Sequence, residues 1–193
     1  MKPASYQKRS RPASATKHGV DHVCATAVHV ALGPVLPEYA ERMFDWVRDP
    51  EVSGNLGLRR EATLERTRQW IESAAADDSM RAFAILAEDR HAGNVVLDQI
   101  DWYLSKARFS IYLGEPAARG RGIGLAATRL ALRVAFEELG LYKVWLTVHT
   151  ANHRAIQTYL NAGFRKEGLL RGEFLIGGAR LDAWYMGVVR GES

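Results

Sequence analysis

The sequence contains one cysteine, Cys24, among 193 residues. A single cysteine excludes an internal disulfide framework and is typical of a chain that works in a reducing compartment. It also excludes zinc sites built from cysteine pairs, and we expect no metal. Long apolar runs are absent as well, so no segment is predicted to cross a bilayer and no membrane partner is expected. These absences together favour a cytoplasmic protein.

Acidic residues are absent from the first 19 residues, which read MKPASYQKRSRPASATKHG. A basic segment with few apolar residues cannot bury enough surface to fold, and it lacks the apolar core of a secretory signal. We therefore predict a disordered basic arm over residues 1–22 and a single domain over 23–193. The chain carries a net charge of +4, and residues beyond the arm are close to neutral, so we expect no nucleic-acid partner.

The hydrophobic pattern predicts strands and helices in a mixed order. Strands are expected over 23–32, 81–88, 94–104, 107–113, 143–149, 164–171 and 180–189, and helices over 37–47, 63–75, from the glycine segment to about 139, and 152–161. Three consecutive strands followed by a strand–helix–strand unit are typical of an α+β fold with a mixed sheet. A doubly wound parallel sheet would need strict alternation of strands and helices.

Residues 119–127, RGRGIGLAA, lie between a predicted strand and a predicted helix. Unpaired backbone N–H groups at a helix N-terminus bind anions, and glycines let a phosphate approach the backbone closely. Arg119 and Arg121 can add charge-assisted hydrogen bonds. The segment is therefore predicted to bind a phosphate group.

The spacing around this segment separates three kinds of phosphate site. It is not a Walker A loop, because no Gly-Lys-Ser/Thr is present. The run Gly122-x-Gly124-x-x-Ala127 fits the dinucleotide pattern, but the loop before it is long and the next strand ends without a ribose-binding acid. The third pattern is R-x-x-G-x-G, which Arg119, Gly122 and Gly124 satisfy.

One strand later the sequence reads N-x-x-A-I-x-x-Y-x-x-x-G-F over residues 152–164. With both motifs the chain resembles the GNAT superfamily of acyl-CoA-dependent N-acetyltransferases. It is most similar to the branch that includes ribosomal-protein N-terminal acetyltransferases and amino-sugar acetyltransferases, and the closing G-x-x-R…D-x-x-Y-M pattern supports that branch. The resemblance runs from 28 to 189 and implies a central, mostly antiparallel sheet with a splayed parallel strand pair, flanked by helices.

The resemblance implies acetyl-CoA as a co-substrate. Its pyrophosphate is expected on the backbone of the glycine segment, and its pantetheine arm along the strand over 109–113. The expected cofactor-binding residues are Ile111, Tyr112, Leu113, Arg119, Gly120, Arg121, Gly122, Ile123, Gly124, Leu125, Ala126, Asn152 and Tyr159.

Asn152 and Tyr159 carry the second half of the resemblance. They are seven residues apart, so on a helix they share a face and lie roughly 10 Å apart along the axis. In this family the asparagine contacts the cofactor and the tyrosine protonates the departing thiolate. The alternatives without a ligand are a helix N-cap for Asn152 and a packed core aromatic for Tyr159.

The general base is the point at which the resemblance weakens. Some peptide N-terminal acetyltransferases carry a glutamate in the strand before the asparagine helix, where this sequence has Thr147. The remaining acidic candidates are Asp98, Asp101 and Glu115, and water is an alternative because an amine of near-neutral pKa needs no strong base.

The acceptor is an amine whose identity the sequence leaves open. The elements expected to form its pocket offer Trp46, Asn55, Trp70, Trp102, Tyr103, Phe174 and Trp184, and Arg59, Arg60, Arg171 and Arg180 are candidates for an anionic acceptor. We expect a primary amine of a small molecule, such as an amino sugar, amino acid or antibiotic-like compound, ahead of a protein N-terminus. A non-catalytic module that senses acyl-CoA or binds nucleic acid is the alternative from another class. The protein is expected to be a monomer or a homodimer.

Overall fold

A computed structural model describes residues 23–24, 28–58 and 61–192 of the chain. The predicted basic arm over 1–22 lies outside these residues, as do Arg59 and Arg60.

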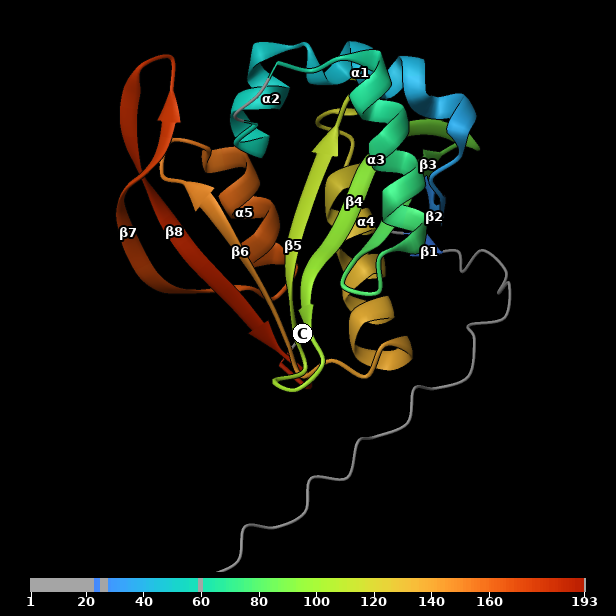
Figure 1. The fold of residues 1–193 in the computed structure, drawn as a ribbon. Helices are drawn as coiled ribbons and strands as arrows, with labels where there is room; N and C mark the ends of the chain where they lie inside the picture. The colour runs from blue at the N-terminus through green and yellow to red at the C-terminus, as the bar shows by residue number, and fades with distance from the viewer. Residues whose placement is uncertain (1–22, 25–27, 59–60, 193) are drawn as a thin grey trace, which may run out of the picture.

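The described chain forms one mixed sheet with helices on both faces (Figure 1). The strands are β1 (Val23–Cys24), β2 (His29–Pro34), β3 (Arg81–Ala87), β4 (Arg90–Asp101), β5 (Lys106–Leu113), β6 (Lys143–His149), β7 (Arg165–Ile176) and β8 (Ala179–Val189). Their order across the sheet is β1-β2-β3-β4-β5-β6-β8-β7, and the pair β5–β6 is parallel while the other pairs are antiparallel. The predicted α+β class is confirmed.

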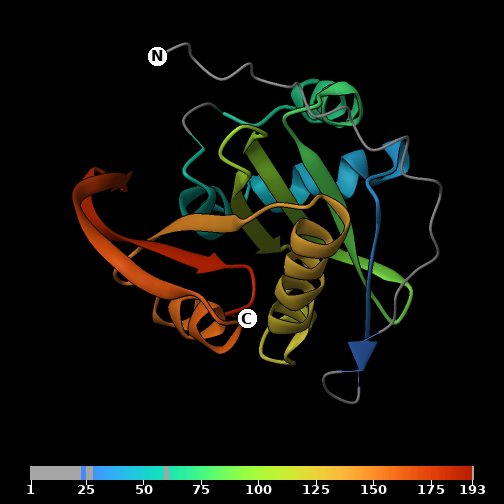
Figure 2. The ribbon, with the colours of Figure 1, turned by 90° about the horizontal axis from the view of Figure 1, so that it is seen from below.

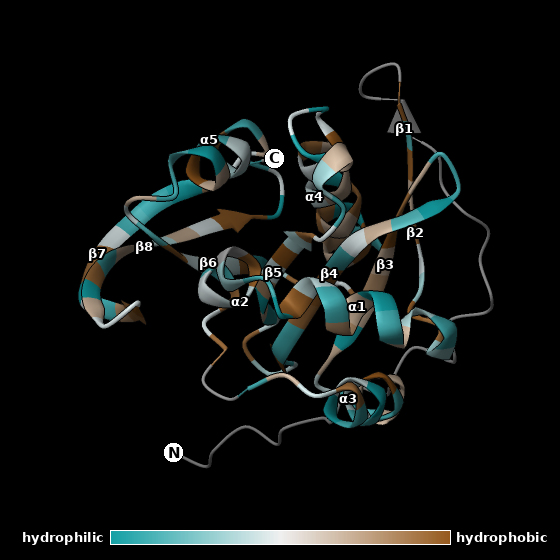
Figure 3. Cartoon of the chain, turned by 90° about the horizontal axis from the view of Figure 1, so that it is seen from above, coloured by the Kyte–Doolittle hydropathy of each residue, from teal (hydrophilic) through white to brown (hydrophobic). Residues whose placement is uncertain are grey.

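The helices are divided between the two faces. They are α1 (Ala40–Val47), α2 (Pro50–Leu56), α3 (Leu64–Ala76), α4 (Ile123–Arg133) and α5 (His153–Asn161), and a π-helical turn over Val134–Glu138 extends α4. Figure 3 shows α1 and α3 on one side of the sheet and α4 and α5 on the other. Figure 2 shows α4 and α5 side by side, and contacts join them. Ile123, Ala127 and Leu130 form a buried face of α4.

Helix α2 is the element that sequence analysis missed. The preceding helix, expected over 37–47, ends at Val47 as predicted, but a further helix, α2, begins at Pro50. Proline fits the first helical position because its missing N–H would be unpaired there. The Ser53 backbone N–H donates to the Asp49 carbonyl at 2.9 Å, which closes the first turn.

Several strand boundaries differ from the sequence prediction. The strand expected over 23–32 is two strands, β1 and β2, which pair antiparallel, and the strand expected over 164–171 extends to Ile176. A turn was expected over 89–93, but β4 already starts at Arg90, and only Glu88 and Asp89 form the turn, both with positive φ. The end of β4 was expected at 104, but the strand ends at Asp101, whose carboxylate accepts hydrogen bonds from the next backbone N–H groups. The turn predicted at 177–178 is confirmed between β7 and β8.

The parallel strands β5 and β6 separate along their length, as Figure 1 shows. They pair at only three positions, from Lys106 opposite Lys143 to Arg108 opposite Trp145. Beyond Arg108, β5 continues to pair with β4 as far as Leu113, and β6 continues to pair with β8 as far as His149. The predicted splayed pair is confirmed, and among the described residues it leaves one edge of β5 without a partner strand over 109–113.

Candidate active site

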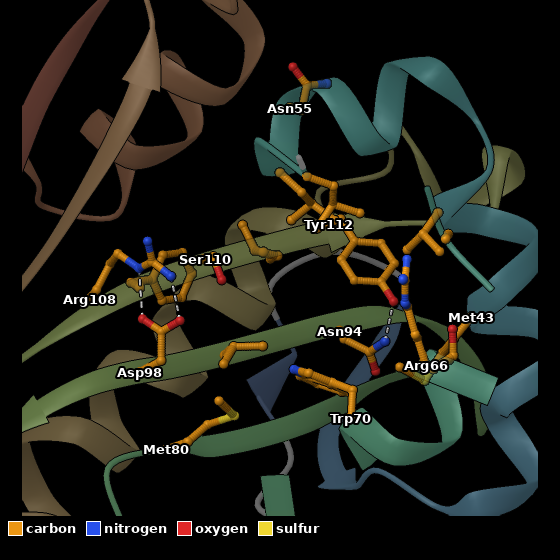
Figure 4. Close-up of a pocket in the computed structure, with 18 of the residues that line it drawn as sticks. Met43, Asn55, Arg66, Trp70, Met80, Asn94, Asp98, Arg108, Ser110 and Tyr112 are labelled. Atoms are coloured by element: carbon orange, nitrogen blue, oxygen red, sulfur yellow. Dashed lines mark hydrogen bonds and ion pairs between the residues drawn. The ribbon is translucent and has the colours of Figure 1, made fainter. Parts of the chain in front are cut away.

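A cavity of about 570 Å³ lies where the sheet opens. Its floor is β4 and β5, its walls come from α1, α2, α3 and β7, and Thr147 and Tyr159 line it from the far side of the gap between β5 and β6. On β5, all five residues from Arg108 to Tyr112 line it, and Figure 4 labels Arg108, Ser110 and Tyr112 among them. A volume of this size is typical of small-molecule sites.

The glycine segment forms the N-terminus of α4. Gly122 is its N-cap with φ of +78°, a conformation that favours glycine, and the first helical hydrogen bond runs from the Ala126 N–H to the Gly122 carbonyl at 3.0 Å. The N–H groups of Ile123, Gly124 and Leu125 therefore have no helical acceptor and face outward from the helix end. An anion is stabilised at such a position.

Arg119 lies just before the N-terminus of α4 and contacts two neighbouring segments of the chain. Its Nε donates to the Leu113 carbonyl at 3.3 Å, and its Nη2 lies 3.9 Å from an Asp49 carboxylate oxygen. The first arginine of the motif thus connects the end of β5 to the residue that precedes α2. This is a structural role in addition to the predicted phosphate contact.

Asn152 caps α5 and also contacts α2. Its Oδ1 accepts from the Ala155 backbone N–H at 3.0 Å, so its Nδ2 faces away from the helix and donates to Asn55 Oδ1 at 3.2 Å. His149 Nε2 lies 2.8 Å from the same Asn55 oxygen and donates to it. Burial lowers the pKa of His149, so the neutral ring is favoured. The predicted N-cap is confirmed, and Asn55 joins α2 to the end of β6.

Tyr159 lies on the buried side of α5 and lines the cavity. Its ring centroid is 6.1 Å from that of Phe109 and 5.8 Å from that of Phe164, so the tyrosine is packed in the core as well as exposed to the cavity. Burial raises the pKa of its hydroxyl far above the ordinary value. The hydroxyl therefore stays protonated and can act as a proton donor.

The three acidic candidates for a general base occupy different places. Asp98 lines the cavity, but Arg108 Nε donates to its Oδ1 at 2.7 Å and Arg108 Nη2 to its Oδ2 at 2.6 Å. Asp101 accepts from the backbone of the turn after β4, and Glu115 precedes a short helical turn at 116–118. Neither Asp101 nor Glu115 lines the cavity.

A buried polar chain at the other end of the cavity was not anticipated from the sequence. Asn94 Nδ2 donates to the Tyr112 hydroxyl at 2.5 Å, and Asn94 Oδ1 lies 3.0 Å from His91 Nε2. The His91 ring stacks on Tyr39 at 4.1 Å and meets Trp46 at 4.8 Å. Burial lowers the pKa of His91 and raises that of Tyr112 to about 12, so both are neutral near pH 7.

The expected acceptor residues are only partly brought together. Asn55, Trp70 and Phe174 line the cavity. Trp46 lies on the buried face of α1 and is not part of the lining, while Trp102 and Tyr103 lie exposed in the turn after β4. The cavity lining does not include Trp184, Arg171 or Arg180. It does include Arg66 and Arg108, which no local sequence pattern identifies as cavity residues.

The described residues contain no group of three or more His, Cys, Asp or Glu side chains placed to hold a metal ion. Within the same residues, no helix is long and apolar enough to span a membrane.

Comparison with known proteins connects this geometry to one family. A family model described as an acetyltransferase (GNAT) domain matches residues 29–165. Spermidine N(1)-acetyltransferase of Escherichia coli strain K12 is 37% identical over 107 residues, which are 55% of this chain and 57% of that protein. The putative ribosomal N-acetyltransferase YdaF of Bacillus subtilis strain 168 is 23% identical over 180 residues, or 88% of this chain and 96% of that protein. The chain thus spans little more than half the length of the first of these relatives.

Solved structures show the same fold. A spermidine N-acetyltransferase from Vibrio cholerae in complex with CoA and spermine superposes with a TM-score of 0.80 at 22% identity, covering 84% of this chain and 96% of that one. RimJ from Mycobacterium smegmatis in complex with CoA-disulfide has a TM-score of 0.79 at 20% identity, with 90% and 88% covered.

Proposed function

The chain belongs to the GNAT acetyltransferase family, and from this premise we propose that it transfers an acetyl group from acetyl-CoA to a primary amine of a small molecule. The single observation that carries the proposal is the cavity, which joins an open sheet edge to the family's tyrosine, Tyr159. A donor thioester and an acceptor amine can meet there.

The donor half of the site is supported by backbone geometry. The unpaired N–H groups of Ile123, Gly124 and Leu125 at the start of α4 suit the pyrophosphate of coenzyme A. The unpaired edge of β5 over 109–113 offers backbone hydrogen bonds to the amides of the pantetheine arm. This path would bring the thioester to the gap beside Phe109, where Thr147 and Tyr159 line the cavity.

The reaction we propose is direct attack in a ternary complex. The neutral amine nitrogen forms a bond with the thioester carbonyl carbon, the carbon–sulfur bond breaks, and the amine loses one proton to water. Tyr159 donates its proton to the departing thiolate and is reprotonated from solvent. A backbone N–H of β5 would stabilise the carbonyl oxygen as negative charge develops on it. Water is the proposed base because Arg108 holds both carboxylate oxygens of Asp98.

The test is a panel of primary amines incubated with acetyl-CoA while free thiol is measured. Amine-dependent thiol release together with an acetylated product would support the proposal. A chain that binds acetyl-CoA tightly, yet releases no thiol with amines or with peptides, would instead be an acyl-CoA-sensing module. The second candidate acceptor is a protein N-terminus, which the match to 96% of the putative ribosomal N-acetyltransferase YdaF favours. Peptides with free and blocked N-termini distinguish the two acceptors.

Two further expectations belong to the same proposal. We propose a cytoplasmic protein that is a monomer or a homodimer. Size-exclusion chromatography with light scattering tests the oligomeric state, and a larger assembly would contradict the expectation.

A further inference from the structure

The charged residues of the cavity indicate which kind of amine it accepts. Four charged side chains line the cavity: the guanidinium groups of Arg66 and Arg108 and the carboxylates of Glu61 and Asp98. Their formal charges sum to zero, so the described lining offers no excess of negative charge to a polycation. The two carboxylates are also placed very differently from each other.

Asp98 is the carboxylate at the floor of the cavity, and it is already neutralised. It lies opposite Arg108 in the register of β4 and β5, its side chain is 16% exposed, and the guanidinium holds both of its oxygens. Bidentate pairing of this kind raises the pKa of Arg108, so the guanidinium stays ionised. An ammonium group in the cavity would meet a carboxylate whose charge Arg108 already balances, so the pair offers it no net negative charge.

Arg108 retains hydrogen-bonding capacity after this pairing. Its Nε and Nη2 bond to Asp98, which leaves the two N–H groups of Nη1 without an acceptor among the described residues. The Arg108 side chain is 40% exposed and lines the cavity. Nη1 is thus an oriented pair of donors, and an oxyanion is its natural ligand.

Arg108 lies at the start of the gap between β5 and β6 in which the thioester is proposed to react. Arg108 is the last residue of β5 that pairs with β6, so it lies where the gap opens. Arg66 reaches the cavity from α3, and its Nη1 donates to the Glu61 carbonyl at 2.8 Å. In Figure 4 the two arginines lie at opposite ends of the cavity, with Ser110 and Tyr112 between them. Arg108 and Tyr112 are four residues apart, roughly 13 Å along the strand.

We propose that the acceptor is a small amine that also carries a carboxylate, and that Arg108 binds this carboxylate through Nη1. The proposal rests on the proposed function and names its acceptor class. It also separates this chain from polyamine acetyltransferases, because every nitrogen of a protonated polyamine is a hydrogen-bond donor, whereas this site needs a ligand that accepts.

The test uses amines of one length that differ only at the far end: 6-aminohexanoate, 1,6-diaminohexane and hexylamine. A four-carbon series, 4-aminobutanoate, 1,4-diaminobutane and butylamine, covers a shorter reach. We expect kcat/KM for the amino carboxylate to exceed that for the diamine at least tenfold in one of the two series. A diamine that reacts as well as the amino carboxylate in both series would overturn the proposal.

Variants that remove one charge change the preference between the amino carboxylate and the diamine, and loss of folding cannot produce such a change. Arg108→Gln removes the positive charge and the guanidinium donors and leaves Asp98 without its cationic partner, so the preference should reverse toward the diamine. Asp98→Asn keeps Arg108 but removes its neutralising partner, so the preference for the carboxylate should increase. Arg165→Gln removes an exposed ion pair with Glu192 outside the cavity, and this matched control should leave the preference unchanged. An unchanged preference in both Arg108→Gln and Asp98→Asn would refute the role of Arg108.

Binding is measured separately from turnover, by the shift in melting temperature that each compound causes. If amino carboxylates stabilise the protein through Arg108 but no amine is acetylated, the proposed function fails and the ligand class stands. If amines are acetylated and diamines react fastest, the function stands and the ligand class fails.

Discussion

Tyr159→Phe separates catalysis from packing at one residue. The ring is held against Phe109 and Phe164, with centroids 6.1 Å and 5.8 Å away, and phenylalanine keeps these contacts. The hydroxyl makes no hydrogen bond with another described residue, so its removal should change the free energy of unfolding by less than about 0.5 kcal/mol. The variant should therefore fold and bind acetyl-CoA as the wild type does.

Its turnover should fall much further. A positioned general acid contributes roughly 10²- to 10⁴-fold, which corresponds to about 3–5 kcal/mol of barrier. Thiol release at saturating acetyl-CoA gives kcat, and thermal unfolding gives the melting temperature. Tyr142→Phe is the matched control, because Tyr142 is exposed and does not line the cavity. A kcat for Tyr159→Phe within twofold of wild type would refute proton donation by this residue, since burial favours its protonated form throughout the assay range.

Two further predictions test the phosphate site proposed at the start of α4 and the buried polar chain of His91, Asn94 and Tyr112. At Gly124 an added Cβ would meet only Leu113 Cδ1, at 3.8 Å, so Gly124→Ala should stabilise the free protein by up to about 1 kcal/mol. The same variant should weaken coenzyme A binding at least tenfold, and Gly168→Ala is the control. An unchanged affinity of Gly124→Ala in calorimetry would contradict a phosphate site at the start of α4. Burial raises the pKa of Tyr112 to about 12, whereas an unfolded tyrosine loses its proton near pH 10. The contribution of Tyr112 to the free energy of unfolding is therefore fully present below pH 10 and falls by about 2–3 kcal/mol as the pH rises to 12. Denaturant unfolding should show this loss in the wild type and a smaller loss in Tyr112→Phe, and equal losses would be evidence against burial of the hydroxyl.

The sequence carries enough information to predict the class of fold and the donor side of the site. The order of most helices and strands along the chain follows from hydrophobic periodicity, and the start of α4 follows from glycines whose backbone geometry few other residues adopt. Helix α2 was missed because it has only seven residues, includes Gly54, and begins on a proline that also ends the preceding helix. The start of β4 was missed because a two-residue turn at 88–89 takes positive φ without any glycine.

The acceptor side could not be predicted in the same way. Asp98 was identified as a candidate, but its partner Arg108 is ten residues away, and only the register of β4 against β5 places them opposite each other. His91 fell within the predicted turn, so its packing and its link to Asn94 were not anticipated. Register depends on which residues are buried across the whole sheet, and a local pattern does not specify it.

This contrast has a physical reason that bears on specificity. The proposed donor contacts are mainly backbone N–H groups, whose geometry is set by local conformation and leaves a mark in the sequence. The proposed acceptor contacts are side chains from four helices, four strands and the loops between them, and a single charge among them changes the ligand class. Family membership therefore supports acetyl-CoA as the donor, whereas the acceptor must be argued from the ion pair between Asp98 and Arg108. The reversal expected for Arg108→Gln tests that argument directly.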